Sequence, residues 1–254
     1  MPNFSGNKIF QPAYSSVSTP LHKIGEKAET ADGRKFRYVL CGATALVVGN
    51  ALQTRIEDVD HDDVTVRATA AGDTDLLITA GSGSGALDAN EYAEGYAVID
   101  TTPGLGYVYK ISGHAAITAS ANGTLVLYKD DAVQVALTAV SKVTLVASPY
   151  SKVIQCPIST DTGVCVGGAI YPIVASEYGW IQSGGPGAAL IVNTPAAGQP
   201  VTNRSSVAGS LAVHSAELPS PAHMMVTGRD GKVLPVYWLL DCHRPVGAGE
   251  GSPS

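Results

Sequence analysis

The densest group of side chains that could bind a metal is the acidic segment from Asp58 to Asp63, which contains four aspartates and His61. Carboxylate oxygens gathered in this way are ligands that Ca²⁺ accepts. The segment lacks the order of an EF-hand loop, because no Gly stands at its sixth position and no Glu closes it. The pattern therefore favours a solvated acidic loop over a cation site.

Histidine and cysteine form no recognisable metal motif elsewhere in the sequence. The six histidines are never two or four residues apart, and the four cysteines form no CxxC pair. We expect Cys41, Cys156, Cys165 and Cys242 to be reduced thiols, most simply buried ones. A Cys156–Cys165 bridge closing a hairpin is the less favoured alternative. The sequence thus predicts no metal site.

Two segments contain parts of nucleophile or phosphate-binding motifs, but the residues around them do not match these motifs. Ser84 stands in a Gly-Ser-Gly run, but the strand-turn-helix frame of a nucleophile elbow is missing around it. The glycines of segments 81–85 and 104–106 match neither a dinucleotide-binding nor a Walker spacing. A Ser-His-Asp triad built from distant residues stays open, with nothing in its favour. We therefore expect no enzyme activity, no catalytic residue and no cofactor.

The composition predicts a folded chain with a weakly charged surface. Of its 254 residues, 45% are hydrophobic and only 15% are charged, against about 25% charged residues in an ordinary soluble domain. With 28 Gly and 15 Pro, much of the surface must consist of neutral turns. Such a surface suits a protein covered by neighbours, because charged side chains are depleted at interface centres. A secreted or surface-exposed β domain fits the same numbers.

The net charge of −6 argues against nucleic-acid binding, which depends on a basic surface. No run approaches the roughly 18 apolar residues of a membrane-spanning helix, so we expect no membrane partner. Residues 1–20 are polar and lack the apolar centre of a signal peptide, which predicts synthesis and folding in a cytoplasm.

The stretch from Tyr96 to Tyr150 is typical of an antiparallel meander. Short β-branched and aromatic runs are separated about every ten residues by Gly, Pro, Asn or Asp. The strands expected here are 96–100, 107–111, 125–128, 133–137 and 143–149. Nothing in the stretch indicates a reaction centre, so it predicts a scaffold whose function lies in its surface.

Ahead of the meander, Asp32-Gly33 predicts a hairpin in which this pair supplies the positive φ angles of a type I′ turn. Residues 43–53 fit a short helix or a buried strand. Segments 64–69 and 76–79 are predicted strands joined by Gly72-Asp73, because both are rich in β-branched or aliphatic residues.

After the meander, residues 178–182 lead into Gly184-Gly185-Pro186-Gly187, which predicts a pronounced turn with segment 189–192 pairing back. Residues 207–213 are a weaker strand. Residues 233–240 are the last strand, in which Pro235 indicates an edge position or a bulge. No segment predicts an amphipathic helix of three turns.

These patterns predict an all-β fold of antiparallel β-sandwich or barrel portions, jelly-roll-like, with an extended N-terminal arm. Jelly roll, β-tulip and two stacked small barrels all satisfy the strand spacing. The expected division is an arm over 1–25, a hairpin-plus-meander domain over 26–152, a second β-rich portion over 153–243 and a flexible tail over 244–254.

The expected arm contains isolated apolar residues among Pro, Asn, Ser and Thr. Terminal composition alone would favour a disordered tail. The spacing of Phe4, Ile9, Phe10 and Tyr14 instead predicts an arm that becomes ordered on a neighbour.

Aromatic residues on one strand face could form a platform for sugar binding. Tyr107 with Tyr109, and Tyr178 with Trp180, share a face if these segments are strands, because strand side chains repeat every second residue. Packing inside a sheet core is the favoured reading for most of them.

Several segments resemble the head decoration, or cement, proteins of tailed bacteriophages. The likeness covers most of the chain from Gly25 to Leu240, and none of its motifs is catalytic. The segments that carry it are 31–39 with 45–49, 94–98 with 104–111, 137–150, and 178–182 with 184–187.

The resemblance implies a protein on the outer surface of an assembled capsid, where it bridges adjacent major capsid subunits and stabilises the mature head. It also implies a symmetric homo-oligomer, with a trimer preferred over a dimer. Under this reading the arm contacts capsid subunits or a neighbouring copy through Phe4, Ile9, Phe10 and Tyr14.

Two other classes stay open. A tail or fibre adhesin that binds host glycan would expose its Tyr and Trp side chains on a platform. A polysaccharide hydrolase would need a cleft with paired carboxylates, and the only acidic clusters are Asp58 to Asp63 and Glu91 with Glu94. These clusters are typical of loops.

Overall fold

The structure is a computed structural model that describes residues 11–83, 85–158, 160–203, 205–214 and 220–241. Over these ranges the chain is all-β, as the sequence predicts, and its named strands pair antiparallel. The helical part of these ranges is one 3₁₀ turn, η1 (Val59–His61). No helix there is long and apolar enough to cross a membrane.

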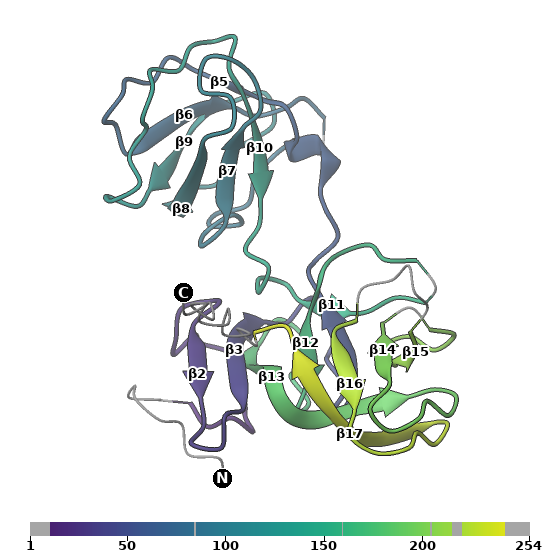
Figure 1. Cartoon of the computed structure of the whole chain (residues 1–254). Helices are drawn as coiled ribbons and strands as arrows, with labels where there is room; N and C mark the ends of the chain where they lie inside the picture. The colour runs from purple at the N-terminus through teal and green to yellow at the C-terminus, as the bar shows by residue number, and fades with distance from the viewer. Residues whose placement is uncertain (1–10, 84, 159, 204, 215–219, 242–254) are drawn as a thin grey trace, which may run out of the picture. The chain divides into compact units, whose positions relative to one another are not determined.

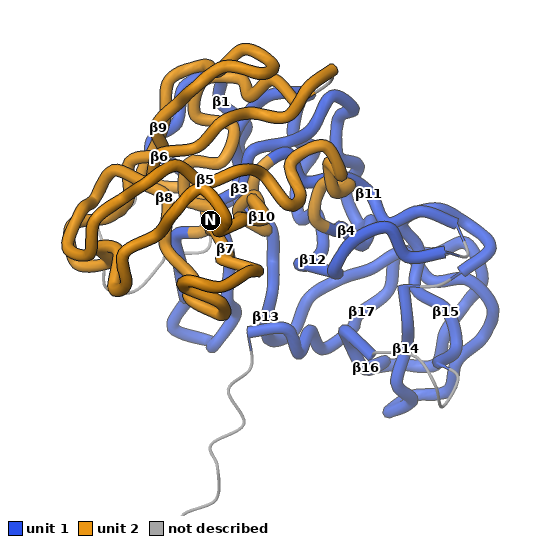
Figure 2. Tube along the Cα trace, turned by 90° about the horizontal axis from the view of Figure 1, so that it is seen from above, with its two compact units in different colours: residues 1–22, 26–53, 152–254 blue, residues 23–25, 54–151 orange. Residues whose placement is uncertain are grey.

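The chain forms two compact units (Figure 2). Unit 1 comprises residues 1–22, 26–53 and 152–254, and unit 2 comprises residues 23–25 and 54–151. The sequence-based division placed 26–53 with the meander, whereas these residues belong with the C-terminal portion. The reason is that β3 (Lys35–Leu40) pairs with β13 (Tyr178–Ile191). The expected tail, 244–254, lies outside the described residues.

Unit 2 is a closed barrel of six antiparallel strands in the order β10-β5-β6-β9-β8-β7 (Figure 1). The strands are β5 (Val64–Val66), β6 (Asp75–Thr79), β7 (Tyr96–Ile99), β8 (Val108–His114), β9 (Asn122–Leu127) and β10 (Lys142–Val146). β7, β8 and β9 pair in sequence order, as a meander predicts. β10 then returns to pair with both β7 and β5, which closes the barrel.

Alternating side chains fill the barrel. Leu76 and Ile78 of β6 and Leu125 of β9 are fully buried. The residues that alternate with them along each strand face outward. Each fully buried aliphatic side chain of this kind contributes about 1.5–3 kcal/mol of transfer free energy. Burial of one sheet face therefore fixes the register of these strands.

The predicted strand over 133–137 is wrong. Val133 and Leu137 bury their side chains in the barrel core, but their backbone N–H groups donate to loop carbonyls of Asp73 and Thr69 at 2.9 Å. The segment forms only an isolated bridge, between Thr69 and Leu137. Its apolar composition serves burial, and no strand runs beside it to form a ladder.

Unit 1 is a curled half-barrel sheet with strand order β11-β4-β12-β13-β17-β16-β14-β15, to which β1, β2 and β3 are added off this path (Figure 1). The strands not yet given are β1 (Ser16–Val17), β2 (Lys27–Glu29), β4 (Ala51–Gln53), β11 (Ile154–Gln155), β12 (Cys165–Ala169), β14 (Pro200–Thr202), β15 (Ala212–Val213), β16 (Ala222–Met224) and β17 (Lys232–Leu239). Trp180 and Trp238, the only tryptophans of the chain, are fully buried in this unit.

The predicted turn over residues 184–187 is wrong. β13 runs through it as one 14-residue strand, pairing with β3 up to Gly184 and with β17 from Gly184 to Ile191. A register shift between Gln182 and Gly184 marks a bulge, which bends a strand without reversing it. The glycines permit this bend, so the segment 189–192 extends the strand where the sequence predicted pairing back.

The predicted hairpin at Asp32-Gly33 is confirmed, because β2 pairs with β3. The expected type I′ turn is wrong. Gly33 has φ +84° but Asp32 does not adopt a positive φ, and the Gly33 N–H donates to the Thr30 carbonyl at 2.9 Å. The loop is thus a tight turn followed by a left-handed glycine.

For residues 43–53 the sequence allowed a short helix or a buried strand. The strand is correct for the last three of these residues, which form β4.

Pro235 lies inside a paired strand and not at an edge. Its position in β17 is in register with Ala188 of β13. On the other side β16 ends at Met224, and the Met225 N–H donates to the Pro235 carbonyl at 3.1 Å. The strand tolerates proline because its missing N–H falls beyond the end of β16.

Residues 11–22 of the expected arm pack on their own unit. β1 pairs with β13, and the fully buried Gln11 side chain donates to the Tyr178 carbonyl at 3.0 Å. Trp180 Nε1 donates to the Gln11 carbonyl at 3.2 Å, and Tyr38 Oη donates to Gln11 Oε1. This part of the arm is therefore anchored to the sheet.

An ion pair joins β3 to the end of β17. The Arg37 guanidinium donates to both carboxylate oxygens of Asp241, with an Nε–Oδ2 distance of 2.6 Å, and Ser183 Oγ donates to Oδ2 at 2.6 Å. Burial works to raise the pKa of Asp241, but the hydrogen bonds from Arg37 and Ser183 outweigh it and lower the pKa below its ordinary value.

We expect Asp241→Asn to reduce the free energy of unfolding of unit 1 by about 1–2 kcal/mol at pH 7. A lowered folded-state pKa stabilises the fold above the unfolded-state value of about 3.9, and this contribution is lost as pH falls through the folded-state pKa. The difference between wild type and variant should therefore shrink as the pH falls from about 3.9 through the lowered folded-state pKa.

Urea unfolding followed by tryptophan fluorescence reports on unit 1, because both tryptophans lie there. Asp75→Asn, which changes an exposed carboxylate in β6, is the control and should leave this signal unchanged. A pH-independent difference between wild type and Asp241→Asn would contradict the role of the ion pair.

Candidate functional site

The clearest unexplained surface of unit 1 is the outer side of its sheet at β13, β16 and β17. In β17 the core-facing residues Leu234, Val236 and Trp238 alternate with the outward-facing residues Val233, Pro235 and Tyr237. All of the outward-facing residues are apolar or aromatic, although strand positions facing water are usually polar. We call the sheet face the six exposed residues Pro186, Ala188, Met225, Val233, Pro235 and Tyr237.

Strand pairing places these six residues side by side. Tyr237 is opposite Pro186 and Pro235 is opposite Ala188, across the β13–β17 ladder. Met225 reaches the same patch because its N–H bonds to Pro235. The exposed fractions are 49% for Val233, 47% for Met225 and 41% for Tyr237.

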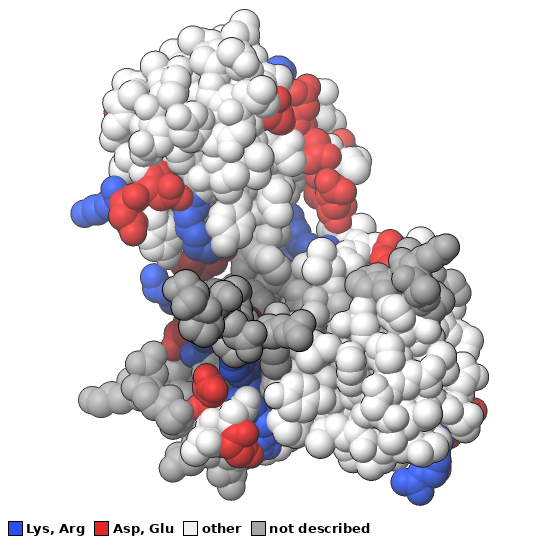
Figure 3. Space-filling view, in the orientation of Figure 1, with Lys and Arg blue, Asp and Glu red and all other residues white. Residues whose placement is uncertain are grey.

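The sheet face contains no Asp, Glu, Lys, Arg or His, and residues of these types stand at its border. Lys232 begins β17, and the preceding turn contains Arg229 and Asp230. Figure 3 shows a broad uncharged surface over β16 and β17. An apolar centre with polar residues at the border is the usual anatomy of a protein interface.

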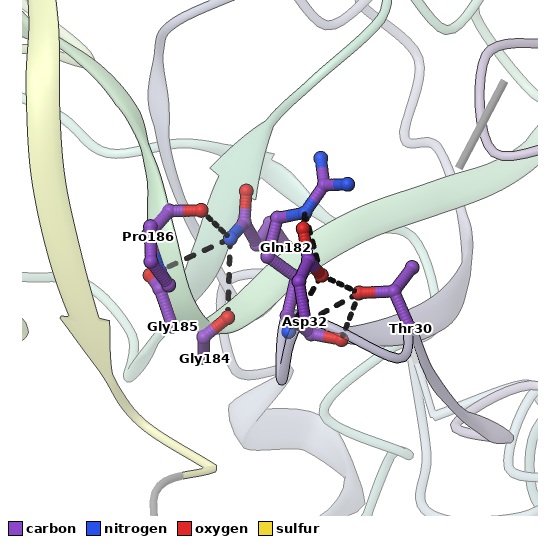
Figure 4. Close-up of polar contacts among 7 residues, drawn as sticks. Thr30, Asp32, Gln182, Gly184, Gly185 and Pro186 are labelled. Carbon is purple, nitrogen blue, oxygen red and sulfur yellow. Dashed lines mark hydrogen bonds and ion pairs between the residues drawn. The ribbon is translucent and has the colours of Figure 1, made fainter. Parts of the chain in front are cut away.

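The bend in β13 that shapes this surface is held by Gln182. Its buried side-chain amide donates to the carbonyls of Pro186 at 2.7 Å and Gly184 at 3.1 Å (Figure 4). A Cβ at Gly187 would lie 2.5 Å from Gln182 Oε1, so only glycine leaves room for the amide. The Gln182 side chain thus supplies hydrogen-bond donors to carbonyls that lose their strand partners at the bulge.

The hairpin loop at Asp32 packs against the same bend. Gly185 has φ +80°, and a Cβ there would lie 2.8 Å from the Gly33 carbonyl oxygen. Within the loop, hydrogen bonds from Thr30 and then Arg34 lower the pKa of Asp32 to about 2 (Figure 4). The loop therefore keeps its charge and its shape over the physiological pH range.

A second apolar surface, in unit 2, lies on two loops at one end of the barrel. Leu105 is 63% exposed, Val140 69% and Tyr107 40%; we call these three residues the barrel patch. The loops are tied together because Ser141 Oγ donates to the Pro103 carbonyl at 2.9 Å. Each unit thus exposes an apolar surface of its own.

A polar hollow in unit 2 has a volume of about 400 Å³ and is lined by Lys110, Tyr128, Asp130 and Asp131. Lys23 Nζ lies 3.2 Å from the Tyr128 hydroxyl and 5.2 Å from the ring centre, so one ring face is in contact with a cation. Its ammonium, hydroxyl and carboxylate groups could bind a hydroxyl-rich molecule.

The acidic segment forms the loop that the sequence predicts, with η1 at its centre. Asp58 accepts a hydrogen bond from the Asp60 N–H at 3.2 Å, and His61 is buried. His61 Nε2 faces the Ala86 carbonyl at 3.2 Å, which leaves Nδ1 to accept from the Tyr92 hydroxyl at 2.5 Å when the ring is neutral. Among the residues described, no group of three His, Cys, Asp or Glu is placed to hold a metal ion.

The two other acidic residues considered for a hydrolase cleft are paired. Glu91 accepts from Arg55 at 2.8 Å, and Glu94 accepts from Tyr128 and lies 3.7 Å from Lys110 Nζ. These carboxylates serve structural contacts within unit 2.

The cysteines Cys41, Cys156 and Cys165 form no disulfide. Cys41 and Cys156 are buried, and Cys165 is partly exposed beside a cavity of about 270 Å³. The hydrogen bond to Cys165 and burial raise the pKa of the Cys156 thiol. Cys242 lies outside the described residues.

The structure shows only part of the contact set expected from the arm. Tyr14 is 41% exposed next to the anchored Gln11. Phe4, Ile9 and Phe10 lie outside the described residues. The sheet face was missed, although segment 232–239 has apolar residues at both odd and even positions, which is a signal of a strand covered on both sides.

The two aromatic pairs do not form sugar platforms. Tyr107 and Tyr109 stack with ring centres 6.1 Å apart, but Tyr109 is buried at 1% exposure. Trp180 is fully buried and contacts Tyr38 edge to face. Core packing is confirmed for Tyr109 and Trp180, whereas Tyr107 is exposed in the barrel patch and Tyr178 is partly buried.

Comparisons with protein-family models, with curated proteins and with solved structures find no match for this chain. The functional reading therefore depends on the surfaces described above and on the segment resemblances in the sequence.

We expect Gln182→Leu to reduce the free energy of unfolding of unit 1 by about 2–3 kcal/mol, because buried carbonyls of the bend lose their donor. Gln199→Leu removes a hydrogen bond from a more exposed turn and should cost less than about 1 kcal/mol. Urea unfolding with tryptophan fluorescence measures both. Equal costs for the two variants would contradict the role given to Gln182.

Proposed function

We propose that this chain is a structural virion protein that binds the outer surface of an assembled phage capsid and cements adjacent major capsid subunits. The observation that supports it best is the pair of apolar surfaces, the sheet face on unit 1 and the barrel patch on unit 2. A protein that joins neighbours needs more than one contact surface. The segment resemblances to head decoration proteins point the same way.

The chemistry of the chain fits a binding role. Its surface is weakly charged, and the described residues bring together no metal-ligand cluster. Apolar contact areas release water on binding without requiring a charged partner. Such contacts are stable against salt, which screens only charge interactions.

In this proposal, the mature shell is selected by differential affinity. Expansion of the capsid creates the binding site, so binding stabilises the expanded state by mass action. Several modest contacts on one molecule, or on a homo-oligomer, give lasting attachment through effective concentration. Each bound copy then adds to the resistance of the shell against internal pressure.

The arm contributes a further contact in this proposal. Its anchored part, residues 11–22, fixes where the chain leaves the sheet, and Tyr14 is exposed there. Phe4, Ile9 and Phe10 precede this anchor in the sequence and would reach capsid subunits or a neighbouring copy.

The test compares copy number and binding. Quantitative mass spectrometry of purified particles should find this chain in proportion to the major capsid protein. In co-sedimentation with mature capsids, Leu105→Glu combined with Val140→Glu should weaken binding at least about tenfold, because charges enter the barrel patch. Val174→Glu combined with Val213→Glu, at exposed valines of unit 1, is the matched control and should bind as wild type.

Two outcomes would contradict the proposal. One is a copy number in proportion to tail proteins, and the other is wild-type protein that fails to bind mature capsids. Unchanged binding by the double variant would instead remove the barrel patch from the contact.

A tail or fibre adhesin that binds host glycan is the second candidate, favoured by the polar hollow around Tyr128. An aromatic ring with ammonium and carboxylate groups nearby can bind sugar hydroxyls. Glycan-array binding by wild type that is lost in Asp131→Ala and retained in Asp75→Ala would support this class. Absence of binding to any glycan would exclude it.

A further inference from the structure

We propose that the sheet face is a two-fold contact surface between two copies of this chain. The starting observation is that a paired sheet surface has apolar residues where water-facing positions normally hold polar ones. Its members come from segments far apart in the sequence, so the patch is a product of the fold. No described part of the chain covers it.

The area fits the centre of a stable interface. With exposed fractions near one half for Val233 and Met225, the sheet face presents on the order of 400 Å² of apolar surface, within the range of the largest patches on soluble monomers. A standard interface buries about 800 Å² on each partner, of which the apolar centre is only a part. Lys232 and His223 at its border would supply polar rim positions.

The absence of charge on the sheet face suits a second copy as the occupant. Each copy has a net charge of −6, so two copies repel one another least where they meet through a surface without charged residues. The sheet face meets this condition, since none of its six residues is charged. A cationic partner would instead be drawn to the acidic surfaces of the molecule.

A single self-complementary patch implies two-fold symmetry. In a two-fold contact the same patch serves both copies, whereas a ring of three needs two different patches that fit each other. The sheet face is one continuous surface on the neighbouring strands β13 and β17 and on Met225, which directly follows β16. The inference therefore names a dimer, where the resemblance implied a preference for a trimer.

This self-association is independent of capsid binding, because it concerns the purified protein alone. It also assigns separate surfaces to separate contacts, with the barrel patch left open for another partner. Failure of the dimer would leave the capsid proposal standing, and failure of capsid binding would leave the dimer standing.

Sedimentation velocity over a range of concentrations up to about 100 μM tests the dimer. Wild type should approach twice the chain mass of 26.0 kDa as concentration rises. Val233→Glu combined with Tyr237→Glu should raise the dissociation constant at least about tenfold, because like charges meet at the contact. Val174→Glu combined with Val213→Glu adds the same two charges at exposed valines elsewhere on unit 1 and should associate as wild type.

The substituted side chains are exposed, so tryptophan fluorescence and circular dichroism of the variants should match wild type. Three results would overturn the proposal. The first is a wild-type protein that keeps the mass of one chain at every concentration. The second is a wild-type species of three chains. The third is a double variant that associates as strongly as the control.

Discussion

The continuity of β13 is the constraint on which unit 1 depends. This one strand pairs with β1, β3, β12 and β17, so a break at its bulge would separate the hairpin side of the sheet from the C-terminal side. The Gln182 amide keeps the strand continuous by supplying donors where the ladder has none. The outer sheet face and the burial of Trp238 on the opposite side of β17 both follow from that continuity.

The sequence predicted the fold class and most strands, because alternation and turn residues act locally. It failed where a local signal had two structural solutions. Gly184-Gly185-Pro186-Gly187 permits a reversal or a bulge, and only the partners on either side of β13 select the bulge. Residues 133–137 have strand composition but fill the barrel core from a loop. Pairing between strands far apart in the sequence, such as β3 with β13, produces no local sequence pattern from which it could be predicted.

The exposed apolar surfaces were less predictable than the fold. Segment 232–239 has apolar residues at both odd and even positions, which is typical of a strand buried on both faces. No sequence pattern indicates that one of these faces is exposed. The barrel patch depends on two loops being tied together by Ser141, whose partner Pro103 is distant in sequence. Tyr14 stands out in the sequence by its isolation among polar residues, and the structure shows that it is exposed.

The barrel is an insertion into the sheet of unit 1, and its two ends meet. Gln53, the last residue before it, pairs directly with Ile154, just after it, in the β4–β11 ladder. On a ribosome, β3 and β4 therefore emerge long before β12, β13 and β17, whereas the barrel strands all emerge together in between. The barrel can close while the sheet still waits for its central strand. The sheet of unit 1, whose strands lie before and after the barrel in the sequence, is thus completed after the barrel.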